Sequence, residues 1–142
     1  MINLKTIRRS LAIALLVSST AIQAESNSHV IKFDDVAWQN TGLEGVEMSI
    51  LWGDEKDTSA IYAFRIQPGV TIPAHTHAND YRGIAIQGNW EHTDSEGDNV
   101  ITAQESFTYI KAGDMHSDKC IGPEFCINVL DFDGFRDFVI PK

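Results

Sequence analysis

The sequence has only two cysteines in 142 residues and no apolar run of 18 residues. These features argue against a small disulfide-dense scaffold and against a protein that spans a membrane. Neither a G-x-S-x-G stretch nor a Walker-type loop occurs, so serine-nucleophile and phosphate-loop chemistry have no support. What is present is an ordinary globular composition, 43% hydrophobic and 22% charged, which predicts one packed domain.

The first 24 residues have the layout of a secretory signal peptide. Three basic residues precede the apolar run from Leu11 to Val17, and small residues lead to Ala24, where we place the cleavage site. The run is shorter than the ~20 residues that cross a bilayer, which disfavours an N-terminal anchor. We expect residues 1–24 to be a signal peptide, residues 25–142 to be the mature domain, and the protein to be periplasmic or secreted.

The mature segment is poor in basic residues. Removing the signal takes away three basic residues and no acidic ones, which leaves 8 Lys+Arg against 20 Asp+Glu, a formal net charge of −12. Such a field repels phosphate backbones and anionic lipids, so we expect no nucleic-acid partner and no membrane partner after cleavage. A neutral or cationic small molecule fits better, although solubility alone also accounts for the charge.

Short apolar runs separated by turn residues predict an all-β domain. The runs are four to eight residues long and rich in Ile, Val, Phe, Tyr and Thr, which is typical of strands, and we find no convincing helix after the signal. The polar segment from Glu91 to Asn99 is interpreted as a hairpin loop. Strands at this spacing indicate a sandwich or closed barrel. The predicted strands are Val46 to Trp52, Ala60 to Ile66, Tyr81 to Gln87, Ser106 to Ile110 and Phe125 to Phe132.

Two histidines, His75 and His77, lie where we expect a strand to begin. Side chains at i and i+2 of a strand point to the same face, so these imidazoles can reach one point. Neutral imidazole binds Fe, Zn, Ni or Cu well. An H-x-H pattern alone is equally compatible with two exposed polar residues on a sheet.

The residues around this pair resemble the first cupin motif, G-x5-H-x-H-x3-E-x6-G. Gly69, His75, His77 and Gly88 stand at its spacings. The second motif, G-x5-P-x-G-x2-H-x3-N, is matched by Gly113 and His116. The resemblance implies a single-domain cupin double-stranded β-helix, a jelly-roll barrel, with His75, His77 and His116 as ligands of a divalent transition metal: iron, zinc, manganese, nickel or copper.

Tyr81 stands where the first motif has its Glu ligand, and Lys111, Glu105 and Cys120 replace the Pro, first Gly and Asn of the second motif. Three histidines without a carboxylate resemble the three-histidine iron cupins, such as thiol and diketone dioxygenases. Tyr81 is then a candidate catalytic residue, as a phenol that hydrogen-bonds a bound water or as a direct ligand. Of these two roles we prefer the hydrogen-bonding phenol, because an unperturbed tyrosine stays protonated near pH 7. An ordinary barrel aromatic without a functional role is an equally weighted interpretation.

Three further stretches, Asp80 to Gly83, Leu51 to Asp54 and the Cys120/Cys126 pair, resemble a group of small exported cupins classed as a domain of unknown function. The cupin half of zinc-containing anti-sigma factors is more distantly similar. The resemblance implies fold and export more directly than activity. It also suggests a homodimer, since cupins often pair through barrel edges.

The other polar residues near the motifs have less definite roles. We interpret His92 as a hairpin surface residue, with a cavity-facing ligand role as the alternative, and expect no role for His29 near the mature N-terminus. A carboxylate close to His116 can orient its free ring nitrogen, or be an ordinary solvated loop residue. The carboxylates concerned are Asp114 and Asp118, while Glu91 and Glu105 are candidate general bases by proximity in sequence alone.

Cys120 and Cys126 flank a turn sequence between two strands. In an oxidising compartment an even pair indicates a disulfide, whose short loop contributes roughly 2 kcal/mol in the chain-entropy model. The alternative makes Cys120 a thiolate ligand or redox group, four residues after His116. We prefer the disulfide, because Cys126 has no other explanation.

Three functional classes remain open. The first is a small-molecule metalloenzyme of dioxygenase or isomerase type, the second a non-catalytic ligand-binding or sensing module, and the third a bare scaffold without metal. We favour the metalloenzyme over the binding module. The sequence does not choose the metal or the substrate.

Overall fold

The computed structural model describes residues 30–56 and 59–141. The predicted signal peptide and His29 lie outside this range. Residues Ile31–Lys142 cluster as one compact unit. None of the helical segments within the described residues has the length and apolar character needed to cross a membrane.

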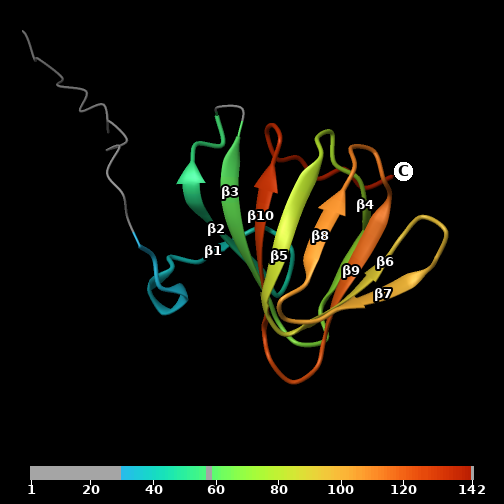
Figure 1. Ribbon diagram of the computed structural model, residues 1–142, viewed down its shortest axis with the longest axis horizontal. Coiled ribbons are helices and arrows are strands. Elements are labelled where there is room, and N and C mark those ends of the chain that lie inside the picture. Colours follow the sequence, from blue (N-terminus) through green and yellow to red (C-terminus); the bar gives the residue numbers. More distant parts are fainter. Residues whose placement is uncertain (1–29, 57–58, 142) are drawn as a thin grey trace, which may run out of the picture. The chain divides into compact units, whose positions relative to one another are not determined.

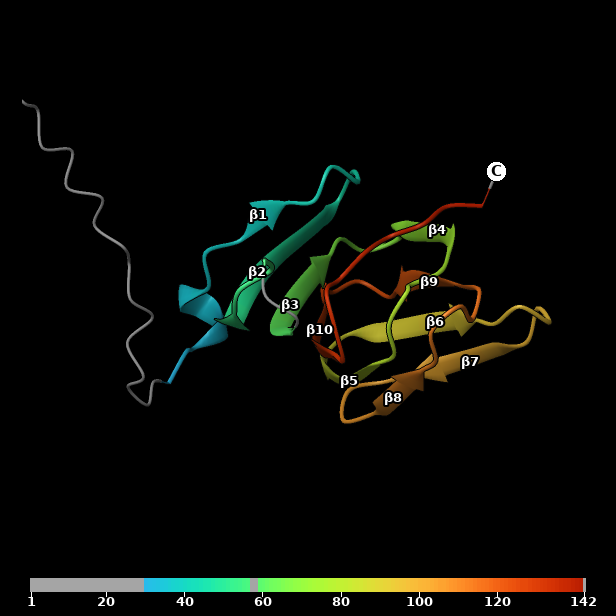
Figure 2. The ribbon, with the colours of Figure 1, turned by 90° about the horizontal axis from the view of Figure 1, so that it is seen from above.

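The described chain contains ten strands, paired antiparallel, and one 3-10 turn, η1 (Phe33–Asp35). The first sheet has the order β1-β2-β3-β10-β5-β8 and the second the order β4-β9-β6-β7 (Figures 1 and 2). The strands are β1 (Gln39–Asn40), β2 (Val46–Gly53), β3 (Ala60–Ile66), β4 (Thr71–His75), β5 (Tyr81–Gln87), β6 (Asn89–Thr93), β7 (Asn99–Thr102), β8 (Phe107–Ile110), β9 (His116–Ile121) and β10 (Cys126–Phe132). This is the predicted all-β cupin architecture.

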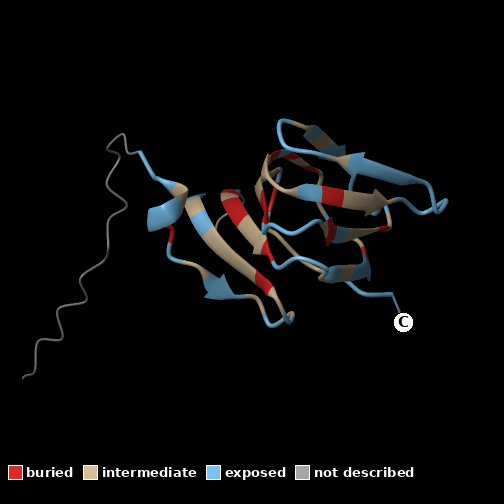
Figure 3. Ribbon diagram, turned by 90° about the horizontal axis from the view of Figure 1, so that it is seen from below, coloured by how far each residue is buried: buried red, intermediate tan, exposed pale blue. Residues whose placement is uncertain are grey.

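Alternation along the strands decides which side chains face the interior. On β5, Tyr81, Gly83 and Ala85 are buried, whereas the residues between them are more exposed. Figure 3 shows buried positions as red bands separated by tan and blue ones along the strands. Because side chains of a strand alternate between its faces, β5 contributes every second residue to the interior.

Gly88 connects the two sheets between β5 and β6. Its φ is +76°, and a Cβ at this position would lie 2.7 Å from the Phe125 carbonyl oxygen and 2.9 Å from the Cys126 sulfur. Only glycine adopts this conformation without strain and leaves space for the neighbouring backbone. The glycine of the first motif therefore allows the chain to pass from one sheet to the other.

The buried core consists of two groups of side chains. The disulfide cluster contains Val46, Ile66, Trp90, Cys120 and Cys126. The aromatic cluster contains Ala60, Tyr62, Tyr81 and Phe132, of which Tyr62 and Phe132 are at most 1% exposed. The two clusters pack at different ends of the strands, and they frame the interior space between the sheets.

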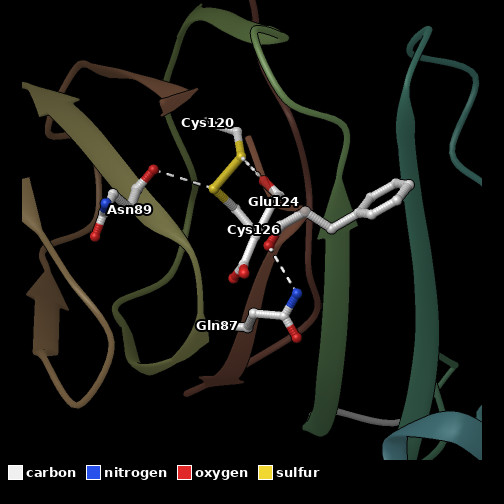
Figure 4. Close-up of a disulfide and its surroundings, with 6 residues drawn as sticks. Gln87, Asn89, Cys120, Glu124 and Cys126 are labelled. Atoms are coloured by element: carbon white, nitrogen blue, oxygen red, sulfur yellow. Dashed lines mark hydrogen bonds between the residues drawn. A yellow bond between two sulfur atoms is a disulfide. The ribbon is translucent and has the colours of Figure 1, made fainter. Parts of the chain in front are cut away.

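Cys120 and Cys126 form a disulfide, with an S–S distance of 2.10 Å and fully buried side chains. The bond joins β9 to β10 and so links the second sheet to the first. Figure 4 shows the Cys126 sulfur facing the carbonyl oxygen of Asn89, 3.1 Å away. Cys120 is therefore not a free thiolate, and the alternative of a sulfur ligand is wrong for this structure.

Most strand predictions are confirmed. Ala60–Ile66 and Tyr81–Gln87 have the predicted bounds, and the other three predicted strands shift by one residue at an end. The loop predicted from Glu91 to Asn99 is too long, because β6 continues to Thr93 and β7 begins at Asn99. The polar segment can form strand because its inward-facing polar side chain, His92, is hydrogen-bonded to Asp118 on β9.

Candidate metal centre

Three buried histidines meet at one end of the interior. His75 is the last residue of β4, His77 follows just after it, and His116 is the first residue of β9. The antiparallel register places His75 directly opposite His116. The three residues are 3%, 7% and 2% exposed, so all of them are buried.

The strand predicted to begin at His75 in fact ends there. Thr76 makes an isolated bridge to Val139, and this extended connection keeps the imidazoles of His75 and His77 on the same side. Their Nε2 atoms lie 3.1 Å apart. The candidate ligand atoms of all three histidines lie within 4.8 Å of one another.

Each ring is oriented by a main-chain carbonyl. The Nδ1–H of His75 donates to the Pro73 oxygen (2.8 Å), and that of His116 donates to the Asp114 oxygen (3.0 Å). His77 donates in the same way to the Asp137 oxygen. This places the proton on Nδ1 and leaves the Nε2 lone pair of each ring directed inward, as metal-bound histidines require.

Lone pairs that converge without a hydrogen between them repel, and a cation at the centre removes that repulsion. Burial and the neighbouring His116 lower the pKa of His75 to about 4, and burial also lowers the pKa of His77. Both rings are therefore neutral near pH 7, which is the metal-binding form. The donor set fits a divalent transition metal.

Tyr81 lies at the edge of this cluster. Its side chain is 5% exposed and stacks on Phe132, and its hydroxyl is 3.1 Å from Nε2 of His116. Burial raises the pKa of Tyr81 well above its usual value, and the charge of Asp118 adds to this shift. Tyr81 is therefore a neutral phenol directed at the histidines, with a proton to donate.

His92 lines the interior, so its interpretation as a surface residue of the hairpin is wrong. His92 lies two residues after Trp90 on β6, and the side chains of both residues face the cavity. The Nδ1 of His92 donates a hydrogen bond to Oδ1 of Asp118 (2.9 Å). That hydrogen bond raises the pKa of His92. The other oxygen of Asp118, Oδ2, lies 3.9 Å from Nε2 of His116.

A main-chain group, and not one of the two candidate carboxylates, orients His116. The Nδ1 of His116 is held by the carbonyl of Asp114, so neither the Asp114 nor the Asp118 side chain orients that nitrogen. Asp118 instead places a negative charge beside the histidines and holds His92. The sequence contains a signal for the position of Asp118 near the histidines, because Asp118 follows His116 by two residues and so lies on the same face of β9.

A cavity of about 370 Å³ adjoins the histidines, near the lower limit of typical small-molecule sites. Residues from both sheets line it, and most of them are apolar. Neither Glu91 nor Glu105, the candidate general bases, is among them. The lining includes Leu43, Val46, Phe64, Ile72, His75, His77, Tyr81, Gly83, Ala85, Trp90, His92, Asp118, Asn128, Leu130, Phe132, Arg136 and Phe138.

Comparison with known proteins gives a consistent family and fold. The family model described as the ChrR cupin-like domain matches residues 26–130. No curated protein matches the chain. Several solved structures resemble this chain, but their sequence identity to it is low. The resemblance therefore shows the fold alone.

Three similar structures illustrate this fold. The polyketide cyclase RemF from Streptomyces resistomycificus has a TM-score of 0.66 at 16% identity, over 80% of this chain and 84% of its own. An RmlC-like cupin from Shewanella frigidimarina has a TM-score of 0.62 at 13% identity, over 77% and 92%. A predicted oxalate decarboxylase from Thermotoga maritima has a TM-score of 0.62 at 17% identity, over 73% and 97%.

Proposed function

The chain belongs to the ChrR cupin-like domain family, and on that basis we propose that it binds one divalent transition metal through His75, His77 and His116 and a small molecule in the adjoining cavity. The observation that carries the proposal is the convergence of three buried Nε2 lone pairs, each ring being fixed by a main-chain carbonyl. Among the described side chains, the Tyr81 hydroxyl is the one group that can offer a hydrogen to any of these lone pairs.

We favour a metal-dependent enzyme of dioxygenase or isomerase type. A bound divalent ion would supply Lewis acidity toward an oxygenated molecule, and iron would add redox chemistry with dioxygen. Tyr81 would hold a proton at its hydroxyl and donate it in a hydrogen bond to an oxygen of the bound molecule. Asp118 would offset positive charge beside His116, at a distance of 3.9 Å.

The second candidate is a ligand-binding or sensing module without turnover. The observation that favours it is the lack of a free general base among the lining carboxylates, since Asp118 is engaged by His92 and Glu91 and Glu105 lie elsewhere. Turnover of a small-molecule substrate by the metal-loaded protein separates the two candidates, because a sensor would bind without product.

The metal content of the purified mature domain tests the proposal. We expect close to one equivalent of a first-row transition metal by elemental mass spectrometry, its loss on dialysis against a chelator, and its recovery on reconstitution. Iron would direct attention to dioxygenase chemistry, and zinc to isomerase or sensory roles. A protein that holds no metal as purified and takes none up on reconstitution would contradict the proposal.

We also propose that the domain acts after export, to the periplasm or beyond the cell. The N-terminal sequence pattern supports this, and so does the buried disulfide, because disulfides persist in oxidising compartments. Fractionation of cells that express the full chain should place a form shortened by 24 residues outside the cytoplasm, with both cysteines oxidised. An unprocessed, reduced protein in the cytoplasm would refute this location.

A further inference from the structure

A carboxylate lies beside the three histidines, on the side of their inward-facing nitrogens. Oδ2 of Asp118 is 3.9 Å from Nε2 of His116, the nitrogen that this ring can offer to a metal. Asp137 also approaches the cluster, but its Oδ1 lies 3.8 Å from Nδ1 of His77, the nitrogen that the Asp137 carbonyl already holds. Within the described part of the chain, Asp118 is the one acidic residue that lines the cavity. Asp118 is thus the carboxylate placed to share an ion with the histidines.

The pairing of strands sets the position of Asp118. It follows His116 by two residues on β9, so both side chains face the interior. Strand β9 lies between β4 and β6 in the second sheet (Figure 2), and Asp118 pairs with Ile72 of β4 and His92 of β6. All three of these residues line the cavity, in the row next to the pair of His75 and His116. Main-chain pairing on both sides therefore holds the carboxylate close to the histidines.

His92 determines which oxygen of Asp118 faces the histidines. Its Nδ1–H donates to Oδ1 of Asp118 (2.9 Å), and the two side chains are only 16% and 14% exposed. The His92 ring also lies against that of His116, with ring centroids 5.3 Å apart. Because Oδ1 is held by His92, Oδ2 is the oxygen that approaches His116. Carboxylates that bind metals are commonly held by such a hydrogen bond, which orients the ligand.

The separations agree with binding of one ion by both groups. Two atoms bound at about 2.1 Å from an ion lie about 3.0 Å apart when their bonds meet at right angles, and at most about 4.2 Å apart. The Nε2 atoms of His75 and His77 are 3.1 Å apart, and Oδ2 of Asp118 is 3.9 Å from Nε2 of His116. Both distances fall in this range. Asp118 therefore borders the three-histidine set at His116, within reach of the same ion.

A carboxylate also balances charge that the histidines leave uncompensated. Imidazole binds a metal in its neutral form, so three imidazoles leave the full double charge of a divalent ion in a buried site. Asp118 would remove one of these positive charges. The Tyr81 hydroxyl is closer to Nε2 of His116, at 3.1 Å, but a phenol stays neutral near pH 7 and offers a proton rather than a charge. The carboxylate is therefore the stronger ligand of the two.

We propose that Asp118 is a fourth protein ligand of the metal, with Oδ2 bound to the ion and Oδ1 held by His92. This inference rests on the proposed metal function and adds to it a residue that neither cupin motif specifies. The ion then has one open coordination position fewer than a site of three histidines would leave. This limits how many oxygens of a small molecule can bind the ion at once.

Cobalt(II) tests the role of Asp118, because the visible absorption of this ion depends on the number and type of its ligands and needs no turnover. The variant is D118N, since asparagine keeps the shape of the side chain and an oxygen that accepts from His92 but carries no charge. We expect D118N to bind cobalt(II) about 10–100-fold more weakly than the wild type, with a changed visible spectrum. The affinity is measured by competition with a chelator.

The matched control is D137N. Asp137 carries the same charge at nearly the same distance from a histidine nitrogen, 3.8 Å, but beside Nδ1 of His77. Its Oδ1 accepts a hydrogen bond from the Ala78 N–H, which asparagine preserves. We expect D137N to lower the affinity less than about threefold and to keep the wild-type spectrum. Equal losses of affinity in both variants, or an unchanged spectrum in D118N, would mean that Asp118 acts through its charge alone, which overturns the proposal.

A second measurement needs no substitution at Asp118. The side-chain carboxyl carbon signals of Asp118 and Asp137 are followed by nuclear magnetic resonance while zinc is added to the wild type. We expect the Asp118 signal to change as zinc binds and that of Asp137 to change far less. An unchanged Asp118 signal overturns the proposal even if D118N does not fold. A wild type that binds neither metal contradicts the metal function itself, whereas binding that is lost in His75→Ala and unchanged in D118N overturns the role of Asp118 alone.

Discussion

Replacement of His75 or His116 by alanine is expected to lower the affinity for the metal by more than about 100-fold. Removal of a residue that only orients a metal ligand lowers the metal affinity about 10–100-fold. These histidines offer the ligand atoms themselves, so their removal should have a larger effect. Two remaining imidazoles would hold a divalent ion poorly. The affinity is measured by competition with a chromophoric chelator.

The same variants should lose the stabilisation that metal gives the fold. An ion present at about 100 times its dissociation constant adds about 2.7 kcal/mol to the free energy of unfolding, and the variants at that concentration should gain almost none. His29→Ala, at a histidine outside both motifs, is the control and should behave as the wild type. If the alanine variants kept the wild-type affinity, the metal would bind at residues other than these histidines.

Phe132→Ala is expected to have the largest effect on stability, about 3–5 kcal/mol. Phe132 is 1% exposed, and its ring contacts Tyr62, Tyr81 and His77 at centroid distances of 5.8, 4.9 and 5.2 Å. Truncation leaves a void among these rings, and domains of this size are stable by only about 5–15 kcal/mol. Denaturant unfolding measures the change.

Phe135→Ala provides the comparison, because Phe135 is three residues away on the same chain segment and 56% exposed. Its removal should change the free energy of unfolding by less than about 0.5 kcal/mol. If the two variants were equally stable, the ring of Phe132 would contribute no more to the core than an exposed one. The metal affinity should also fall in Phe132→Ala, because the rings of His77 and Tyr81 pack against Phe132 and would lose that support.

Much of the fold and the histidine set could be predicted from the sequence. Short runs such as Ala60–Ile66 give strands because β-branched and aromatic residues are bounded by turn residues, and the spacing of His75, His77 and His116 matches a known pair of motifs. Such local patterns are visible without coordinates. The structure places the Tyr81 hydroxyl 3.1 Å from Nε2 of His116, and its catalytic role stays a prediction.

What escaped prediction depends on contacts between distant segments. The polar and acidic neighbours of His92 predict a surface position, yet Asp118, 26 residues later, satisfies its ring inside the barrel. The set of residues that lines the cavity cannot be recognised from sequence, because strands of both sheets contribute to it. Motifs therefore locate the histidines, but the shape and polarity of the cavity need three dimensions.

The acceptor for His77 belongs to a late part of the chain. His75 and His116 each use a carbonyl two residues earlier, but His77 uses that of Asp137, 60 residues downstream. Thr76 beside it pairs with Val139. A nascent chain that has already emerged with both histidine motifs therefore still lacks the group that orients one of its three ligands. Completion of the ion site therefore requires the segment from Asp137 to Val139 to dock beside His77, wherever the chain folds.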